Sequence, residues 1–279
     1  MSVARQPVSR RLRVNGLVTH FLDAGDGEPL LLLHGGEFGA GAEVTWHRCI
    51  GELATDRHVV AADLFGFGRS DKVRDLVDQR TRIVGQIADL LDALCFESVD
   101  VVATSFSARL LVDVAATAAD RWRLRRGVSI GLGLSPPSRT ALAALGSFDG
   151  SAETMAATID LLFHDDAVRR AELAARMELA LLPGAWQSGR AAVIGRPANV
   201  AATRPEPVDY GAIDRPLLLI RGEHDALVDP DDFAAFAAAI PTAQTAAVAA
   251  AGHYPQVERP AETAALITSF LAAGTSEED

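Results

Sequence analysis

The feature that most constrains the fold of this chain is an alternation between short apolar segments and longer stretches with helical patterning. Strands that are apolar on both faces and separated by helices are typical of a mainly parallel sheet with helices on each side. The sequence therefore predicts a doubly wound α/β fold. Its main strands are expected in the segments PLLLLHGG (29–36), HVVAADLFG (58–66), ESVDVVATS (97–105), RRGVSIGLG (125–133), PLLLIRGEHD (216–225) and AQTAAVAAAGH (243–253).

Local signals place the first two strands and the helices. Asn15 and Gly16 lie between the segments RLRV and LVTHFLDAG, and Asn-Gly is a strong signal for a two-residue hairpin turn. Helix-like stretches separate the later strands. Helices are predicted at residues 43–55, 80–94, 108–118, 231–239 and 261–272.

A segment from about residue 136 to residue 205 interrupts the alternation. It holds helix-like runs such as ETMAATIDLLF and DAVRRAELAARMELALL but no convincing strand, and the strand pattern resumes at Pro216. Open α/β sheets bind ligands at the carboxyl ends of their strands, so we expect a helical lid over that edge. A separate helical domain is the alternative. The predicted division is a core of residues 1–135 and 206–279 with a lid of residues 136–205.

Composition, charge and residue spacing limit the partners, the cellular location and the cofactors to be expected. The net charge of −11 argues against nucleic acid or an anionic membrane as partner, and no apolar run approaches the roughly 20 residues of a membrane helix. The basic start of the chain has no apolar segment behind it, so no signal peptide is expected. Cys49 and Cys95 lack metal-site and disulfide spacing, and the seven histidines lack ligand spacing. We expect a cytoplasmic protein that needs no metal or cofactor.

Polar residues follow three of the predicted strands at the ends where such folds bind ligands. Ser105, Asp225 and His253 occur in that order along the chain. A serine hydroxyl is a weak nucleophile at neutral pH and needs an adjacent base, which must itself be oriented. His253 would take the proton from Ser105, and Asp225 would hold the imidazole and stabilise its cation. The pattern predicts a catalytic triad.

Five motifs in order make the chain resemble the α/β-hydrolase superfamily from about Arg11 to Ala273: LLLHGG, DLFGFGRSD, ATSFSA, RGEHDALVDP and AGHYPQVERP. The last two resemble that family's acid and histidine loops most closely. The resemblance implies an oxyanion hole formed by the backbone N–H groups of Gly36 and Phe106. Preorganised donors of this kind are usually the largest catalytic term.

The turn around the predicted nucleophile departs from the usual G-x-S-x-G pattern, because Ala103 and Ser107 replace the glycines. Both are small, as a tight strand-to-helix turn requires. Ser105 therefore remains the predicted nucleophile, and the alternative is an altered turn in a protein that binds without cleaving. Serine at this position disfavours dehalogenases and epoxide hydrolases, which need a carboxylate nucleophile.

Within the superfamily, the loop HGGEFGA followed by Trp46 resembles the meta-cleavage-product hydrolases. Those enzymes split carbon–carbon bonds in vinylogous diketones made by aromatic ring fission. The segment GRAAVIGRPANV resembles the part of their lid that carries an arginine, which would make Arg190 a clamp for a substrate carboxylate or dienolate. The alternative for Arg190 is a solvated charge on a lid helix. Further substrate contacts are expected from Gly35, Thr104, Trp186 and Tyr254.

Two of these positions differ from that group. Thr104 replaces an asparagine and Tyr254 replaces a tryptophan, which indicates a pocket reshaped for another substrate. The lid is rich in alanine and leucine, so the pocket is expected to be apolar and to take a small molecule. His34 is expected to support the oxyanion loop, and Asp229, Asp231 and Asp232 to lie in a turn and helix N-cap.

The leading hypothesis is a cofactor-independent serine hydrolase of a small apolar ester, lactone or activated carbon–carbon bond, acting through an acyl-enzyme. One alternative keeps the triad but catalyses a cyclisation, elimination or acyl transfer in a biosynthetic pathway. Another is a ligand-binding protein with little turnover. The sequence leaves the oligomeric state open, a homodimer included.

Overall fold

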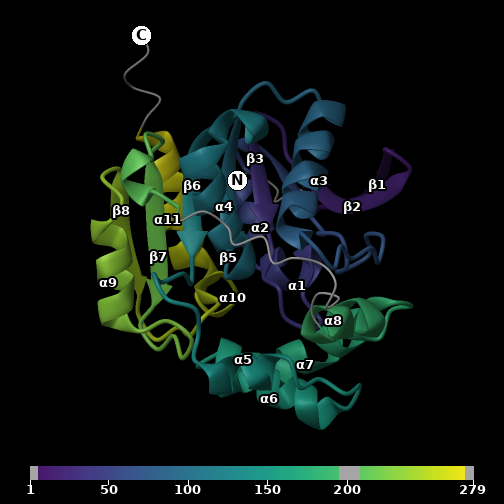
Figure 1. Ribbon diagram of the computed structural model, residues 1–279. Coiled ribbons are helices and arrows are strands. Elements are labelled where there is room, and N and C mark those ends of the chain that lie inside the picture. Colours follow the sequence, from purple (N-terminus) through teal and green to yellow (C-terminus); the bar gives the residue numbers. More distant parts are fainter. Residues whose placement is uncertain (1–5, 195–207, 274–279) are drawn as a thin grey trace.

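The computed structural model describes residues 6–194 and 208–273, which form an eight-stranded sheet with helices on both faces (Figure 1). The strand order is β1-β2-β4-β3-β5-β6-β7-β8. β1 pairs antiparallel with β2 and β2 with β4, whereas the other neighbours are parallel. The predicted α/β class with a mainly parallel sheet is confirmed. The strands are β1 Val8–Val14, β2 Leu17–Ala24, β3 Glu28–Leu33, β4 Arg57–Ala62, β5 Val99–Thr104, β6 Leu124–Ile130, β7 Leu217–Gly222 and β8 Ala243–Val248.

The predicted hairpin turn joins β1 to β2. Val14 pairs with Leu17 across a two-residue loop, in which Asn15 and Gly16 have φ values of 51° and 82°. Asparagine and glycine tolerate positive φ better than other residues, so this turn follows directly from the dipeptide.

Two hydrophobic clusters fill the spaces between the sheet and its helices. Leu31 and Leu33 of β3 point into one cluster, whereas Leu30 and Leu32 point into the other. This alternation is the two-residue period of a strand, and it explains why the central strands are apolar throughout. The first cluster is covered by α3 Gln79–Ala93, α4 Phe106–Thr117 and α9 Pro230–Ala238, and the second by α1 Ala42–Trp46, α2 Ile50–Leu53 and α11 Pro260–Ala272.

One predicted helix is wrong in its extent. Residues 43–55 form two short helices, α1 and α2, separated at residues 47–49. At the break the Cys49 N–H bonds the carbonyl of Trp46, three residues back instead of four. The break keeps both Trp46 and Ile50 buried in the second cluster. Packing against the sheet therefore outweighs the uninterrupted helical pattern.

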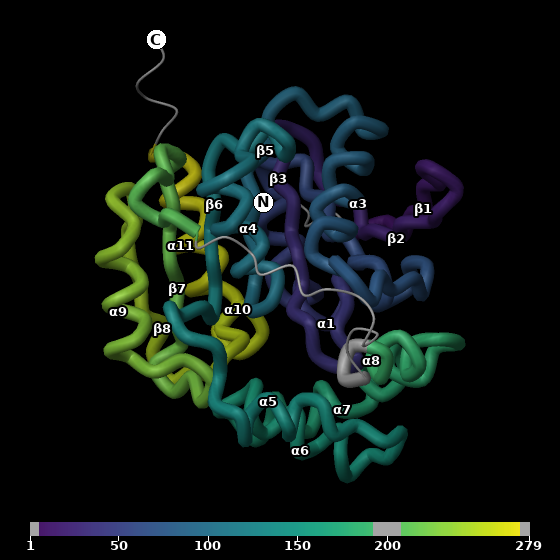
Figure 2. Tube along the Cα trace, in the orientation of Figure 1, coloured from purple at the N-terminus to yellow at the C-terminus, as the bar shows by residue number. Residues whose placement is uncertain are grey.

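Four helices inserted between β6 and β7 form the lid: α5 Arg139–Leu145, α6 Ala152–Leu162, α7 Asp166–Ala180 and α8 Ala185–Ile194. They form a separate layer across one end of the sheet (Figure 2). No strand occurs in the described part of this insert, residues 136–194. A third hydrophobic cluster joins Met155 and Ile159 of the lid to Phe38 and Tyr254 of the core. The exact domain boundaries stay a prediction, because residues 195–207 lie outside the described residues.

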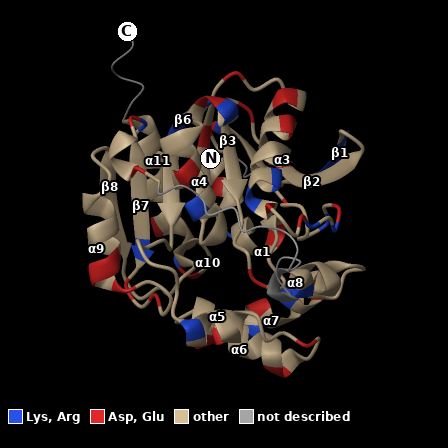
Figure 3. Ribbon diagram, in the orientation of Figure 1, with Lys and Arg blue, Asp and Glu red and all other residues tan. Residues whose placement is uncertain are grey.

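Charged residues lie mostly on the helices and loops around the sheet (Figure 3). Among the helices that the structure describes, none is both long and apolar enough to cross a membrane.

Candidate active site

Ser105 occupies a tight turn between β5 and α4. Its backbone has φ 54° and ψ −115°, a conformation that costs energy for any residue with a side chain. The Ser105 N–H donates a hydrogen bond of 2.8 Å to the carbonyl of Ile130 on the neighbouring strand β6. The sheet thus holds the serine in a strained conformation at the carboxyl end of β5.

The two replaced glycines of this turn are accommodated. Ala103 and Ser107 are fully buried. The Ser107 hydroxyl donates to the carbonyl of His34, so it ties α4 to the oxyanion loop, residues 34–41 between β3 and α1. Glycine could not supply that bond.

His253 and Asp225 form a buried pair in the loops that follow the last two strands, β8 and β7. Asp225 follows β7, and His253 lies in the histidine loop, residues 249–254 after β8. The Nδ1 atom of His253 is 2.8 Å from Oδ2 of Asp225. The other carboxylate oxygen accepts the N–H groups of Leu227 at 2.8 Å and Val228 at 3.2 Å. These bonds orient the carboxylate and, through it, the imidazole.

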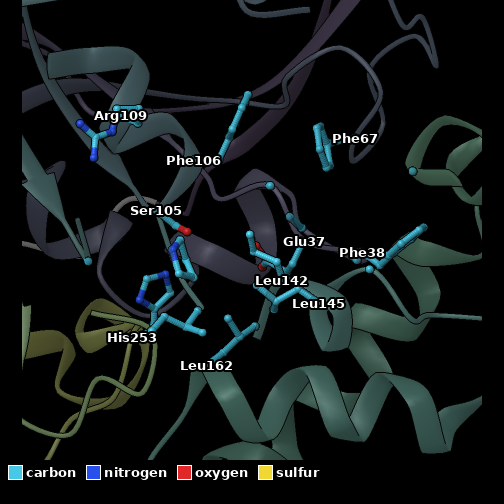
Figure 4. Close-up of a pocket in the computed structure, with 18 of the residues that line it drawn as sticks. Glu37, Phe38, Phe67, Ser105, Phe106, Arg109, Leu142, Leu145, Leu162 and His253 are labelled. Atoms are coloured by element: carbon cyan, nitrogen blue, oxygen red, sulfur yellow. The ribbon is translucent and has the colours of Figure 1, made fainter. Parts of the chain in front are cut away.

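The environment of His253 favours its protonated form. Burial alone would lower the pKa of His253, but the charge and hydrogen bond of Asp225, aided by the charge of Glu37, raise that pKa above its usual value. Its Nε2 atom is buried and has no hydrogen-bond partner among the described residues. Ser105 and His253 line the same cavity (Figure 4). A basic nitrogen is therefore available on the wall that also carries the serine.

Gly36 and Phe106, the predicted oxyanion donors, lie against each other on the cavity wall. A Cβ atom on Gly36 would come within 2.9 Å of the Phe106 Cβ. Glycine is thus needed here for close approach. His34 supports this loop as predicted: its Nε2 accepts the Leu64 N–H at 3.0 Å and its Nδ1 lies 2.6 Å from the Gly35 carbonyl. Burial lowers the pKa of His34, which favours the neutral form of its imidazole.

The cavity has a volume of about 640 Å³ and is lined by residues of the lid, the oxyanion loop and the ends of the strands. This volume suits a small organic molecule. Most of its lining is apolar, with Phe38, Phe67, Leu142, Leu145 and Leu162 visible in Figure 4. Among the residues that the structure describes, the acidic and basic side chains on its wall besides His253 are Glu37, Arg74, Arg80 and Arg109.

The three arginines differ in their partners. Arg80 is paired with Asp113, and Arg109 donates to Tyr210 Oη at 2.6 Å and to the carbonyl of Leu134 at 3.1 Å. Arg74 is half-buried and has no hydrogen bond or ion pair in the part of the chain that the structure describes. Burial lowers the pKa of its guanidinium. Arg74 is therefore a cation on the cavity wall without a counter-charge from the described residues.

Glu37 belongs to a buried network that reaches the lid. Arg176 Nη1 of helix α7 lies 2.5 Å from one of its carboxylate oxygens, and the Tyr254 hydroxyl donates to the other at 2.7 Å. All three side chains are almost completely buried.

Five residues predicted to contact substrate do not line the described cavity. Thr104 is fully buried beneath the turn, and Tyr254 is occupied by its bond to Glu37. Gly35 lies behind the wall, where an added Cβ would come within 1.9 Å of the Tyr254 hydroxyl. Trp186 is 40% exposed on α8, and the Arg190 guanidinium lies 6.0 Å from the centre of its ring. Their predicted substrate roles gain no support from the cavity geometry.

Sequence reasoning missed Glu37, Arg74 and Arg176. Glu37 could have been found from the sequence, because it is a charged residue directly after HGG in a loop that follows a buried strand. Arg74 and Arg176 gave no such signal, because one lies in a polar loop and the other in an ordinary pattern of helix residues. The predicted cap role of Asp229 is confirmed, since its side chain accepts the N–H groups of Asp231 and Asp232 at the start of α9.

A doubly wound sheet with a serine on a strained strand-to-helix turn, a buried histidine–aspartate pair and a helical insert defines the α/β-hydrolase class of fold. The chain belongs to this family: the model described as "Alpha/beta hydrolase family" matches residues 30–266. The family membership predicted from the five motifs is therefore confirmed, and the protein is an enzyme of this family.

Comparison with known proteins shows which members of the α/β-hydrolase family this chain resembles. The chain is 30% identical over 269 residues to 2-hydroxymuconate semialdehyde hydrolase of Pseudomonas sp. strain CF600, with 95% of this chain and 94% of that protein covered. Its fold resembles the 2-hydroxy-6-oxo-6-phenylhexa-2,4-dienoate hydrolase of Rhodococcus sp. strain RHA1, with a TM-score of 0.83, 22% identity and coverage of 96% and 99%. It also resembles the meta-cleavage product hydrolase of Pseudomonas fluorescens IP01, with a TM-score of 0.79, 24% identity and coverage of 95% and 97%. The predicted resemblance to carbon–carbon bond hydrolases is thus confirmed.

Proposed function

We propose that the protein is a serine hydrolase in which Ser105 is the nucleophile, His253 the base and Asp225 the residue that orients the base. The observation that carries this proposal is the strained backbone of Ser105, φ 54°, on the wall of the cavity that His253 also lines. Such strain persists only where the surrounding structure maintains it, and it is concentrated at functional sites.

The reaction follows from this arrangement. His253 accepts the Ser105 proton as the serine oxygen attacks a substrate carbonyl carbon. The N–H groups of Gly36 and Phe106 stabilise the negative charge on the carbonyl oxygen. The tetrahedral intermediate collapses to an acyl-enzyme as the leaving group departs with a proton. Water, activated by His253, then releases the acid and regenerates Ser105.

The proposed substrate is a small, largely apolar dienol acid whose carbon–carbon bond is cleaved next to a ketone. Support comes from the names of the relatives, which are hydrolases of a hydroxymuconate semialdehyde and of a phenylhexadienoate. Protonation of the dienol to its ketone tautomer must precede attack, because only the ketone lets the departing carbon leave as a stabilised carbanion. Ester hydrolysis by the same residues needs no such step.

The charged residues on the cavity wall also favour an anionic substrate. Glu37 is neutralised by Arg176, whereas Arg74 has no partner among the described residues. A guanidinium offers forked donors that match a carboxylate. We therefore assign the substrate carboxylate to Arg74 in preference to Arg190.

A paired assay tests the proposal. Wild type and Ser105→Ala are each given a yellow ring-fission dienol acid and a short p-nitrophenyl ester. Bleaching of the dienol that depends on Ser105 is expected, and label from oxygen-18 water must enter the acid product. Full turnover by Ser105→Ala would refute the mechanism. Tight binding without product would favour a ligand-binding protein, and product without label would favour non-hydrolytic chemistry.

A further inference from the structure

Glu37 is a buried carboxylate at the junction of three parts of the molecule. It directly follows Gly36 in the oxyanion loop, and its side chain is only 3% exposed. It also lies on the cavity wall and is labelled in Figure 4. The proposed reaction assigns it no part, although a buried charge beside reacting groups is unusual without a role.

Each oxygen of this carboxylate binds a different segment. Oε1 is 2.5 Å from Arg176 Nη1 of lid helix α7, and Oε2 accepts the Tyr254 hydroxyl at 2.7 Å. Tyr254 directly follows His253 in the histidine loop. One side chain therefore links the oxyanion loop, the lid and the loop that carries the proposed base.

Glu37 is the hydrogen-bonded counter-charge of Arg176. The arginine side chain is fully buried, and its Nε and Nη2 atoms have no hydrogen-bond partner among the described residues. The nearest other carboxylate, that of Glu172, is 3.9 Å from Nε. The Phe163 and Tyr254 rings flank the guanidinium at 5.2 Å and 5.3 Å. A poorly paired buried charge is strongly unfavourable, so loss of Glu37 would leave Arg176 with only the longer Glu172 contact and would destabilise α7 in this position.

The backbone of the loop is fitted to this network. A Cβ atom on Gly35 would lie 1.9 Å from the Tyr254 hydroxyl and 2.6 Å from Glu37 Oε2. The hydroxyl and the carboxylate thus pack directly on the peptide that precedes Gly36, one of the proposed oxyanion donors. A shift of either group would move that donor.

We propose that Glu37 is a positioning residue, which holds the oxyanion loop in register with the histidine loop and with lid helix α7. This inference rests on the proposed function, because it concerns the same site. Glu37 touches no reacting atom in the proposed mechanism and acts through Gly36 and His253.

Glu37 also acts through its negative charge, which affects the pKa of His253. A residue that only held the loops in place would have no such effect. Burial alone would raise the pKa of the Glu37 carboxyl, but Arg176 and Tyr254 outweigh this effect and hold the pKa below its usual value. The ionised carboxylate helps Asp225 to raise the pKa of His253. Among the described residues, the other titratable groups that face Glu37 are His34, whose pKa is lowered by burial, and the hydroxyl of Tyr254, whose pKa is raised by burial and by the Glu37 charge.

The test compares Glu37→Gln with Tyr254→Phe, using the p-nitrophenyl ester and full pH profiles. Glu37→Gln removes the charge at nearly constant shape. We expect kcat to fall by about 100-fold with little change in KM, because misplacement of a catalytic group by about 1 Å costs that much. The acid limb of kcat/KM should move to lower pH. Tyr254→Phe removes one hydrogen bond but keeps the charge, so its acid limb should stay at the wild-type position.

A second measurement keeps the inference testable if Glu37→Gln is unstable or the ester is a poor substrate. The double variant Glu37→Gln/Arg176→Met removes both buried charges, and Arg170→Met on the exposed face of α7 is the matched control. The ring of His253 is titrated by NMR in the Ser105→Ala background, where no turnover is needed. A lower His253 pKa in both Glu37 variants and an unchanged one in Arg170→Met is expected. An unchanged titration together with wild-type kcat in Glu37→Gln would overturn the inference, whereas full activity of Ser105→Ala would instead overturn the proposed function.

Discussion

Ser105 combines a strained backbone with a position on the cavity wall. Its φ of 54° lies in the left-handed region, which glycine adopts freely and serine does not. The hydrogen bond to Ile130 and the packing of Ala103 and Ser107 maintain this conformation. The turn is thus destabilising locally and exposes the hydroxyl to the cavity.

The strain predicts opposite effects on stability and activity. Ser105→Gly should increase the free energy of unfolding by about 1 kcal/mol, because glycine relieves the strained φ. Ser105→Ala keeps the strain and should leave stability nearly unchanged. Both variants should lose turnover. Urea denaturation of the three proteins checks this, and equal stabilities of the glycine and alanine variants would contradict it.

The His253–Asp225 pair predicts the pH dependence of activity. His253 must be neutral to act as a base, and its folded pKa is raised above its usual value of about 6.5. Activity should therefore be low below that folded pKa and rise as pH increases through it. In Asp225→Asn the rise should occur at lower pH, and kcat should fall by about 10⁴-fold, because the imidazole loses its orientation and its counter-charge. A kcat/KM profile from pH 4.5 to 9 measures both effects.

Arg74 and Arg190 give contrasting predictions for an anionic substrate. Arg74→Gln should raise KM for the dienol acid by about 10- to 100-fold, the value of a hydrogen bond to a charged group. KM for the neutral ester should hardly change. Arg190→Gln is the matched control and should leave both KM values near wild type. The reverse result would return the carboxylate clamp to Arg190, as the resemblance to the meta-cleavage-product hydrolases implies.

At the scale of elements, helix α7 is attached to the core by charge as well as by apolar packing. Arg176 reaches Glu37, while Val168 and Leu179 are buried on the same helix. The helix begins where the Asp165 side chain accepts the N–H groups of Ala167 and Val168. These contacts connect α7 of the lid directly to the oxyanion loop.

This attachment predicts a large loss of stability from a single lid substitution. Arg176→Met should lower the free energy of unfolding by about 3–5 kcal/mol, because it leaves the Glu37 carboxylate buried without its partner. Glu37→Gln/Arg176→Met should recover much of that loss, since it removes both charges. Arg170→Met should change stability by no more than about 0.5 kcal/mol. Chemical denaturation distinguishes these outcomes, and additive single effects would contradict the coupling.

Most element positions were predictable because local chemistry determines them. The predicted helix at 80–94 differs by one residue at each end from α3, and the 231–239 helix differs likewise from α9. The helix predicted at 108–118 begins two residues earlier, at Phe106, because the turn at Ser105 leads straight into it. The helix predicted at 43–55 divides in two, since burial of Trp46 and Ile50 is a tertiary effect that periodicity does not record.

At the scale of the whole molecule, Ser105, Asp225 and His253 come to one candidate site because they follow parallel strands, whose carboxyl ends share an edge of the sheet. That rule explains why three residues separated by up to 148 positions could be grouped from the sequence. It holds for residues that directly follow strands. It does not extend to lid residues, whose placement depends on how the helices pack over that edge.

The sequence by itself determined the fold class, the helical insert, the family and the candidate nucleophile, acid and base. The fold class and the insert follow from strand and helix periods, and the family follows from the resemblance of five motifs. The candidate nucleophile, acid and base follow from residues next to strand ends, and all of these signals are local. Only the tertiary structure decided which cations line the cavity, with Arg74 on its wall and Arg190 beside Trp186. It alone brought Glu37 to Arg176, which are 139 positions apart. Contacts between side chains on separate elements depend on packing angles and helix rotation, and no local pattern encodes these.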